Sequence, residues 1–526
     1  MMKVRAAFAR TARVMLVVVM APVLSPGFLA WGQRPPEGVR RILRESDFRA
    51  GKWGLAVSDL KTGEELWAKN GNRLFVPASV TKLFTVGATL DGLGSDYRFR
   101  TPVYARSGPD AEGAVEGPLV LVASGDLTLG GRSAEGETLA FADSDHTYAS
   151  FLDKVGLVDV DPLAGLDALA RQIAAAGVKT VRGGVLVDER IFEPASSSGS
   201  GPARVSSFVL NDQVIDFQIS PGNAGEPALV DWRPRGAAIV VESRVETGGE
   251  GSAPEIRIRR RGGARFELSG TIALDADPLV RIEEMEDPAA LGARLFVERL
   301  SAAGVETQEG EGSGGKDLMP DQLDGYASWV KLAELVSPPF SENAKVILKV
   351  SHNLHASTLP LLLAARNGER DFDAGMRLEG EFLRRAGLDR GEVSFAGGAG
   401  GERADRVTPR AAVRFLRYMA SHRDAEAYRA ALPVLGVDGT LADVVDPGSP
   451  ARGKVRAKTG TLVWRSGLDG RYLLTSKALS GFLETASGRE LVFAIFVNDV
   501  LVDDRAKVRE AGKRLGKICE ILVEAY

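Results

Sequence analysis

The fold is decided by residues 77–94, Pro-Ala-Ser-Val-Thr-Lys-Leu-Phe-Thr-Val-Gly-Ala-Thr-Leu-Asp-Gly-Leu-Gly. Their apolar positions predict a buried helix that ends at one of the last two glycines. Before them, residues 53–59 and 65–69 alternate apolar and polar side chains around a Lys-Thr-Gly turn, which predicts a β-hairpin. Ser79 therefore lies where a strand passes through a proline into a buried helix, and Lys82 follows one turn later on the same face.

Ser79 and Lys82 are the residue types of a nucleophile and its base. A helix N-terminus favours a developing oxyanion, and a lysine whose pKa is lowered can take the serine proton. The alternative is an N-capping serine beside a solvated lysine. The same spacing occurs at Ser58, Ser313 and Ser328, but only Ser79 follows a strand-to-helix turn.

Two further motifs follow along the chain. Ser351-His352-Asn353 comes at the end of an apolar helical run and offers a hydroxyl that can relay a proton and an amide that can hold a peptide carbonyl, while Ser341-Glu342-Asn343 is a competing match. Residues 456–462, Arg-Ala-Lys-Thr-Gly-Thr-Leu, place a lysine and two hydroxyls beside a glycine in a β-prone stretch. Such a strand lets a substrate backbone approach closely and offers donors to a carboxylate; the alternative is a hairpin turn.

The order Ser-x-x-Lys, Ser-x-Asn, Lys-Thr-Gly is the signature of penicillin-recognising serine enzymes. Together with the 272-residue separation of Ser79 and Ser351 and stretches such as residues 209–222 (VLNDQVIDFQISPG), it makes the chain resemble the penicillin-binding proteins of the D-alanyl-D-alanine carboxypeptidase/endopeptidase family, of low-molecular-mass class C type. The resemblance implies an α/β fold. A five-stranded antiparallel sheet would be flanked by helices, with a helical cluster that carries Ser351 and with inserted, mostly β domains.

The resemblance also implies roles for eight residues. Ser79 would be the acylated nucleophile and Lys82 its general base, with their oxyanion hole formed by the backbone N–H groups of Ser79 and Thr461. Ser351 would pass the proton to the leaving amine, and Asn353 would bind a substrate amide. The third motif would supply positive potential and grip the terminal carboxylate, through Lys458, Thr459, Gly460 and Thr461.

Several positions depart from the family pattern. Gly397-Gly398-Ala399-Gly400 replaces the usual Asp-Gly-Ser-Gly, Leu127 replaces a common proline, and residues 463–477 form an extra segment that contains Trp464. We expect Trp464 to be an exposed hairpin residue rather than part of the cleft. His352 and His355 could share a metal, but no third ligand is apparent, so we expect no metal and no cofactor.

The chain is longer than one hydrophobic core usually serves, and the additional residues have a definite place in the sequence. Between the first and second motifs, short β-like runs alternate with Gly- and Ser-rich stretches around one clear helix at residues 163–176. We expect a split catalytic domain at 33–100 and 326–526, an inserted domain at 101–204 and 290–325, and a nested domain at 205–289. After residue 329, helical periodicity returns, beginning with Leu-Ala-Glu-Leu-Val at 332–336, and residues 477–485, 490–498 and 503–525 predict two strands and a final helix.

Composition limits the remaining choices. The chain has 526 residues, a net charge of −4, four His and one Cys, which gives no reason to expect nucleic acid and excludes an intrachain disulfide. Residues 1–32 have the cationic, apolar and small-residue layout of an export signal, and the apolar run is too short for a membrane span. We expect cleavage after Gly32, an extracytoplasmic or periplasmic protein, and no integral membrane association; an uncleaved anchor is the alternative.

The activity implied by the resemblance is that of an exported serine DD-carboxypeptidase, and possibly DD-endopeptidase. It would act on peptidoglycan stem peptides through an acyl-enzyme on Ser79, with β-lactams as covalent inhibitors. The alternatives are a β-lactamase or D-amino-acid esterase of the same fold, or an inactive wall-binding protein.

Overall fold

The computed structural model describes the chain apart from residues 1–33, 46–47, 49, 151–154 and 309–317. The expected export signal and Ser313 therefore lie outside the described residues. No helix in the described part of the chain is both long and apolar enough to cross a membrane.

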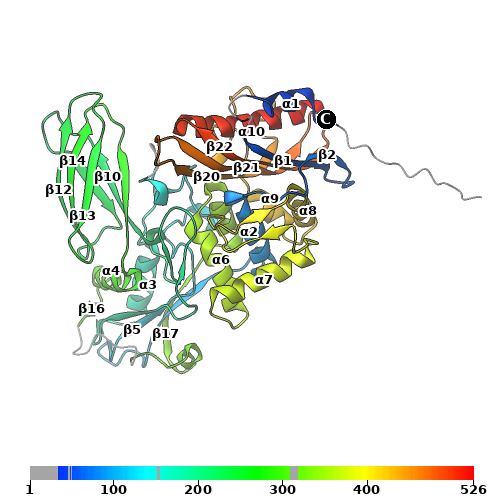
Figure 1. Cartoon of the computed structure of the whole chain (residues 1–526). Coiled ribbons are helices and arrows are strands. Elements are labelled where there is room, and N and C mark those ends of the chain that lie inside the picture. Colours follow the sequence, from blue (N-terminus) through cyan, green and yellow to red (C-terminus); the bar gives the residue numbers. More distant parts are fainter. Residues whose placement is uncertain (1–33, 46–47, 49, 151–154, 309–317) are drawn as a thin grey trace, which may run out of the picture.

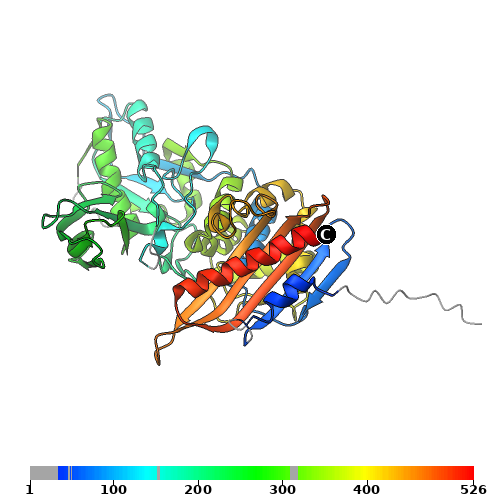
Figure 2. The ribbon, with the colours of Figure 1, turned by 90° about the horizontal axis from the view of Figure 1, so that it is seen from above.

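A five-stranded antiparallel sheet unites the two ends of the chain, as the fold class requires (Figures 1 and 2). Its order is β2 (Glu65–Lys69), β1 (Lys52–Asp59), β22 (Glu490–Val502), β21 (Tyr472–Glu484), β20 (Val455–Arg465). The Lys-Thr-Gly copy at Lys61 forms the β1–β2 turn, where Gly63 has φ +77° and the Thr62 N–H donates to Asp59. The predicted hairpins at both ends of the chain are confirmed.

Both faces of this sheet are buried, so its central strands are almost wholly apolar. Successive side chains of β22 point to opposite faces, so Phe493 belongs to one core and Phe496 to the other. One core lies under α1 (Glu37–Ile42) and α10 (Arg505–Ala525), the other under the helical cluster. The helices of that cluster are α2 (Thr81–Leu93), α5 (Phe340–Lys345), α6 (Asn353–Arg366), α7 (Phe372–Arg385), α8 (Pro409–Ala420) and α9 (Ala425–Ala430).

The inserted residues form separate small sheets beside the helical cluster (Figure 1). The first has the order β17 (Val330–Val336), β3 (Arg100–Ala105), β5 (Leu119–Val122), β7 (Val185–Asp188), and it packs with α3 (Ala164–Ala175) and α4 (Pro288–Ala302). Two three-stranded sheets follow, formed by β11 (Leu229–Arg233), β10 (Val214–Ser220), β15 (Leu279–Glu284) and by β12 (Val240–Gly248), β14 (Arg265–Ala273), β13 (Glu255–Arg260). The remaining strands of the described residues are short. β16 (Glu306–Thr307), β6 (Thr180–Val181) and β4 (Ala114–Val115) form one sheet in that order. β8 (Ala195–Ser196) pairs with β9 (Arg204–Val205), and β18 (Val393–Ser394) pairs with β19 (Arg406–Val407).

One local prediction is wrong, and another is confirmed. Residues 332–336 are not helical, because they belong to β17, which pairs antiparallel with β3 and so extends the first inserted sheet beyond the expected boundary at 326. The expected end of the apolar helical run before Ser351 is confirmed: a π-helical turn, Val346–Val350, ends at Ser351, whose φ of +70° lies in the left-handed region. The division into three domains otherwise stays a prediction.

Candidate active site

The first motif occupies the entrance to α2. Ser79 lies in a short 3₁₀ turn, Ala78–Val80, directly before the helix. The Lys82 Nζ lies 2.9 Å from Ser79 Oγ, 2.6 Å from Asn353 Oδ1 and 2.8 Å from the carbonyl of Ala399. Burial lowers the pKa of Lys82 to about 7, against the opposing charges of Asp145 and Asp405. A large fraction of Lys82 is therefore neutral near pH 7 and able to accept the proton of Ser79.

The second motif lies opposite Ser79 at the break between two helical segments. The left-handed conformation of Ser351 costs energy for a non-glycine residue, and such strain is characteristic of functional positions. Asn353 begins α6, and its amide Nδ2 donates to the carbonyl of Ser200 at 2.9 Å while its Oδ1 faces Lys82. The competing match is elsewhere, in α5, where the backbone N–H of Ser341 bonds to Ser95.

The third motif lies in β20 as an extended strand, so the alternative of a hairpin turn is excluded there. Lys458 Nζ donates to Ser351 Oγ at 2.9 Å, and burial together with the nearby charges of Lys82 and Lys477 holds its pKa well below the ordinary value. Gly460 is needed because a Cβ there would lie 2.4 Å from the carbonyl of Pro77. Close packing of β20 on the turn that carries Ser79 thus requires a glycine.

The two threonines of this motif border the site. Thr459 Oγ1 donates to Thr440 at 2.8 Å, and the exposed Thr461 accepts from Lys477 Nζ at 2.9 Å. Burial lowers the pKa of Lys477 to about 8. Hydrogen bonds therefore join Lys82 to Ser79 and Asn353, and Lys458 to Ser351. The hydroxyl of Tyr148 contacts the backbone of both Ser351 and Asn353 and so connects the two groups. Thr459, Gly460 and Thr461 follow Lys458 along β20. The oxyanion hole formed by the N–H groups of Ser79 and Thr461 stays a prediction.

The glycine-rich departure at 397–400 has a backbone role that the sequence did not reveal. Gly400 has φ +89°, and a Cβ there would lie 2.0 Å from the carbonyl of Ala78. A Cβ on Gly398 would lie 2.3 Å from the carbonyl of Ala356. These close approaches bring the Ala399 carbonyl to Lys82, so this loop orients the Lys82 ammonium through its backbone.

Tyr148, from the inserted region, is a site residue that sequence reasoning missed. Its hydroxyl donates to the carbonyl of Ser351 at 2.9 Å and accepts the N–H of Asn353 at 3.2 Å. Both bonds hold the backbone on either side of His352, at the strained break. No local pattern marks Tyr148, because it meets the second motif only through the tertiary fold.

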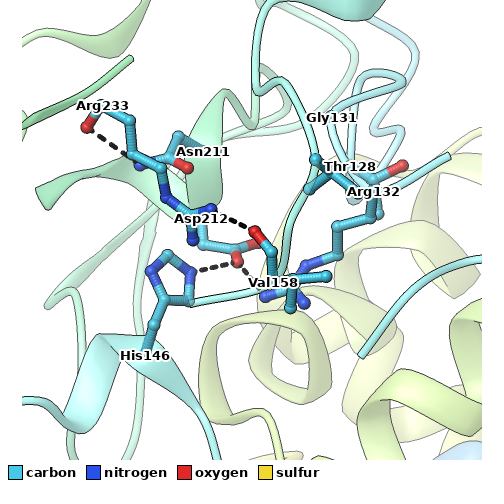
Figure 3. A pocket seen from close by; sticks show the side chains of 9 residues that line it. Thr128, Gly131, Arg132, His146, Val158, Asn211, Asp212 and Arg233 are labelled. Atoms are coloured by element: carbon cyan, nitrogen blue, oxygen red, sulfur yellow. Dashed lines mark hydrogen bonds and ion pairs between the residues drawn. The ribbon is translucent and has the colours of Figure 1, made fainter. Parts of the chain in front are cut away.

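Three of the four histidines lie together behind the second motif: His146, His352 and His355. Figure 3 shows His146 and Arg132 both directed at the carboxylate of Asp212. The two ring nitrogens of His146 lie 2.7 Å from Asp212 Oδ2 and 2.7 Å from Asp216 Oδ1. Since carboxylates only accept, His146 donates from both nitrogens and is cationic; burial opposes this charge, but the two carboxylates raise its pKa to about 9.

The carboxylate of Asp212 also contacts two histidines at the start of α6. His355 Nε2 lies 2.7 Å from Asp212 Oδ1, and the stacked ring of His352, 3.7 Å away between centroids, has its Nε2 3.3 Å from Asp212 Oδ2. His352 Nδ1 caps α6 by accepting the N–H of His355 at 3.4 Å. Two sets of three side chains are close enough to hold a metal, Asp145, His146 and His352, and Asp212, His352 and His355. Asp212 is therefore a possible third ligand that the sequence did not reveal, but it already accepts from Arg132, His146 and His355, as expected for a network of hydrogen bonds and ion pairs.

Comparison with known proteins gives one family. The profile of the D-Ala-D-Ala carboxypeptidase 3 (S13) family matches residues 37–517. A D-alanyl-D-alanine carboxypeptidase of Actinomadura sp. (strain R39) is 32% identical over 484 residues, which cover 88% of this chain and 80% of that protein. The D-alanyl-D-alanine carboxypeptidase DacB of Haemophilus influenzae is 22% identical, covering 86% of each chain.

The fold has the same relatives. The crystal structure of penicillin-binding protein 4 (DacB) from Haemophilus influenzae aligns with a TM-score of 0.67 and 20% identity, covering 92% of this chain and 99% of that one. A structure of the same protein in complex with a β-lactam aligns with a TM-score of 0.65.

Proposed function

Because the chain belongs to the D-Ala-D-Ala carboxypeptidase 3 (S13) family, we propose that Ser79, Lys82, Ser351, Asn353 and Lys458 carry out its chemistry. The protein is a serine-type D-Ala-D-Ala carboxypeptidase with the fold of a penicillin-binding protein, acting on peptidoglycan stem peptides. The observation that carries the assignment of residues is the contact of the buried Lys82 with both Ser79 and Asn353.

Acylation begins when neutral Lys82 takes the Ser79 proton as Oγ bonds to the carbonyl carbon of the penultimate D-Ala. Backbone N–H groups of Ser79 and Thr461 stabilise the oxyanion. As the C–N bond breaks, Ser351 gives its proton to the leaving D-Ala amine. The proton on Lys82 replaces it, directly or through Lys458, which donates to Ser351 Oγ.

Deacylation reverses the proton flow. Lys82 takes a proton from water, whose oxygen attacks the ester carbonyl, and the proton returns to Ser79 Oγ as the shortened peptide leaves. In the earlier acylation step, Thr459 and Thr461 bind the carboxylate of the leaving D-Ala, where Lys458 and Lys477 supply positive potential. A β-lactam acylates Ser79 by the same steps, but its leaving amine stays tethered to the acyl group.

Covalent labelling by a fluorescent penicillin tests this assignment. The wild-type protein should be labelled once per chain and should release D-Ala from an acylated peptide that ends in D-Ala-D-Ala. Ser79→Ala should lose both. Ser328→Ala is the matched control, because Ser328 begins a second Ser-x-x-Lys sequence but lies at the end of a surface 3₁₀ turn. A label that persists in Ser79→Ala would overturn the assignment, and rapid release of hydrolysed penicillin would favour the β-lactamase alternative.

We also propose that the enzyme works outside the cytoplasm, where its substrate is. The support is the signal-like layout of residues 1–32. N-terminal sequencing of the protein recovered from the periplasm should begin at Gln33; recovery of the full-length chain in the cytoplasm would contradict export.

A further inference from the structure

A cleft of about 1500 Å³ borders Thr461 and the β20–β21 hairpin, so it belongs to the site already described. Trp464 lines this cleft and is 60% exposed. The expectation that Trp464 lies on an exposed hairpin is therefore confirmed, but the expectation that it lies outside the cleft is wrong.

A second cavity lies in the helical cluster, between α7 and the segment 388–395 that follows it. Its volume of about 410 Å³ is within the range typical of small-ligand sites. Apolar side chains such as Leu388 and Phe395 line it, and Phe395 packs against Phe84 of α2, with ring centroids 5.0 Å apart. Figure 1 shows α7 on the side of the helical cluster away from the five-stranded sheet, so this cavity is separate from the cleft beside β20.

A buried carboxyl group also lines this cavity. Glu379, on α7, is 1% exposed, and its Oε2 atom has no hydrogen-bond partner among the described residues. A buried polar atom that lacks a partner costs free energy, and such atoms are rare in native structures. A ligand that donates a hydrogen bond to Oε2 would remove that cost.

The other oxygen of Glu379 connects the cavity with the active site. Oε1 lies 3.2 Å from Thr85 Oγ1, which in turn lies 3.1 Å from the carbonyl oxygen of Gly398. A hydroxyl has one hydrogen and a carbonyl only accepts, so both contacts are hydrogen bonds when a protonated Glu379 donates to Thr85. Burial raises the pKa of Glu379 to about 8, and the charge of Asp405 acts in the same direction, which supports the protonated form.

Thr85 and Gly398 adjoin the groups that hold the proposed general base. Thr85 follows Lys82 by one turn of α2. The residue after Gly398, Ala399, accepts a hydrogen bond from Lys82 Nζ at 2.8 Å. The protonated carboxyl thus holds, through Thr85, the loop that orients Lys82.

The charges around the cavity indicate its ligand. Three cations and two anions are exposed on the lining, Arg377, Arg384, Arg390, Glu381 and Asp389. Arg377 and Arg390 form no ion pair with another described residue, and an arginine suits a carboxylate. The Oε2 atom of Glu379 suits an ammonium group. An amino acid with an apolar side chain carries a carboxylate, an ammonium group and an apolar body.

We propose that this cavity is a second ligand site, which binds an amino acid with an apolar side chain and thereby loosens the hold of residues 397–400 on Lys82. An ammonium group at Oε2 favours the ionised form of Glu379, whose proton passes to water. Thr85 then has one hydrogen for two acceptors, so the carboxylate competes with the carbonyl of Gly398 for it. Acylation slows as a result. This effect on acylation rests on the proposed function, whereas binding in the cavity does not.

Calorimetric titration of the full-length protein with phenylalanine tests the site. The protein is first acylated with benzylpenicillin, so that the active site is occupied. We expect 2-phenylethylamine, which lacks the carboxylate, and 3-phenylpropionate, which lacks the amine, to bind at least tenfold more weakly, because each loses a charge-assisted hydrogen bond. Glu379→Gln should weaken binding of phenylalanine to a similar extent. Asp373→Asn is the control, because Asp373 is an exposed carboxylate of α7 that does not line the cavity.

Stopped-flow acylation by benzylpenicillin tests the coupling. Saturating phenylalanine should slow acylation of the wild-type protein at least fivefold, which is the lower end of usual allosteric effects. Acylation of Glu379→Gln should change less than twofold, because its amide can donate to Thr85 but cannot ionise. On the wild-type protein, 3-phenylpropionate should have no effect, and this arm does not depend on the folding of a variant.

The outcomes separate the site, the coupling and the chemistry. Absence of phenylalanine binding to the acylated protein would overturn the site. Binding without slower acylation, or equal slowing in Glu379→Gln, would overturn the coupling. Failure of the proposed function would instead appear without any added amino acid, as absent penicillin labelling of the wild-type protein.

Discussion

Replacing His146 with glutamine should remove a pH-dependent part of the protein's stability. His146 is buried, with one ring nitrogen on Asp212 and the other on Asp216, while Arg132 and His355 also bind Asp212 and Arg233 binds Asp216. Glutamine can keep a hydrogen bond, but it cannot supply the charge that two buried carboxylates need.

The magnitude follows from the shift in pKa. Folding raises the pKa of His146 from 6.5 to about 9. A raised pKa means that the stabilisation is fully present below about pH 6.5 and is lost as the pH rises through about 9. At 1.36 kcal/mol per pKa unit, the charged form contributes about 3 kcal/mol. At lower pH the stability changes with pH in the opposite direction. Folding lowers the pKa values of Asp212 and Asp216, so their contribution to stability is lost as the pH falls through those folded values.

Urea unfolding at pH 6 and pH 9.5 measures this contribution. The pH dependence of the wild-type protein alone does not isolate His146. Burial lowers the pKa values of Lys82 and Lys477, so the free-energy cost of burying these two cations falls as the pH rises. We therefore expect the stability difference between wild type and His146→Gln to shrink by about 3 kcal/mol from pH 6 to pH 9.5. His422→Gln controls for histidine replacement, since His422 contacts Asp91 instead. A His146→Gln difference that is equal at both pH values would refute the charged bridge.

The rate of acylation by benzylpenicillin should rise with pH through an inflection near 7 as Lys82 loses its proton, and a flat profile from pH 5.5 to 8.5 in stopped-flow measurements would contradict its role as base. Tyr148→Phe should lower kcat for D-Ala release about tenfold with little change in thermal stability, because it removes the hydroxyl that holds the backbone around the second motif; unchanged kcat would show that the motif holds its own shape. Gly400→Ala should reduce penicillin labelling at least tenfold, because its Cβ would lie 2.0 Å from the Ala78 carbonyl, and full labelling would mean that the loop can move away. Cys519 should resist a thiol reagent until the protein unfolds, since it is fully buried and burial raises its pKa; rapid reaction of the native protein would show that α10 opens.

The sequence predicts those parts of the site that depend on local chemistry. Ser79 and Lys82 share one turn, and Lys458 to Thr461 share one strand, so local spacing and the neighbouring secondary structure place them. The end of the helical run before Ser351 is expected from the sequence, but the left-handed conformation of Ser351 could not be predicted, because the residues that hold it lie outside that run. Residues 332–336 form a strand although their apolar spacing also fits a helix, since a run that short is decided by its pairing with β3.

Apart from those of the 397–400 loop, the contacts that escaped prediction cross from the inserted region to the second motif. Tyr148 holds the backbone of Ser351 and Asn353, and Asp212 holds the histidines on the first turn of α6, although 203 and 143 residues separate Tyr148 from Ser351 and Asp212 from His355. A non-glycine residue in the left-handed region persists only when its surroundings compensate the strain. The inserted region supplies that compensation here, so its removal should distort the hydroxyl that faces Lys458 even if the catalytic sheet and α2 stay folded. The inserted region therefore helps to orient Ser351, through the hydrogen bond from Tyr148.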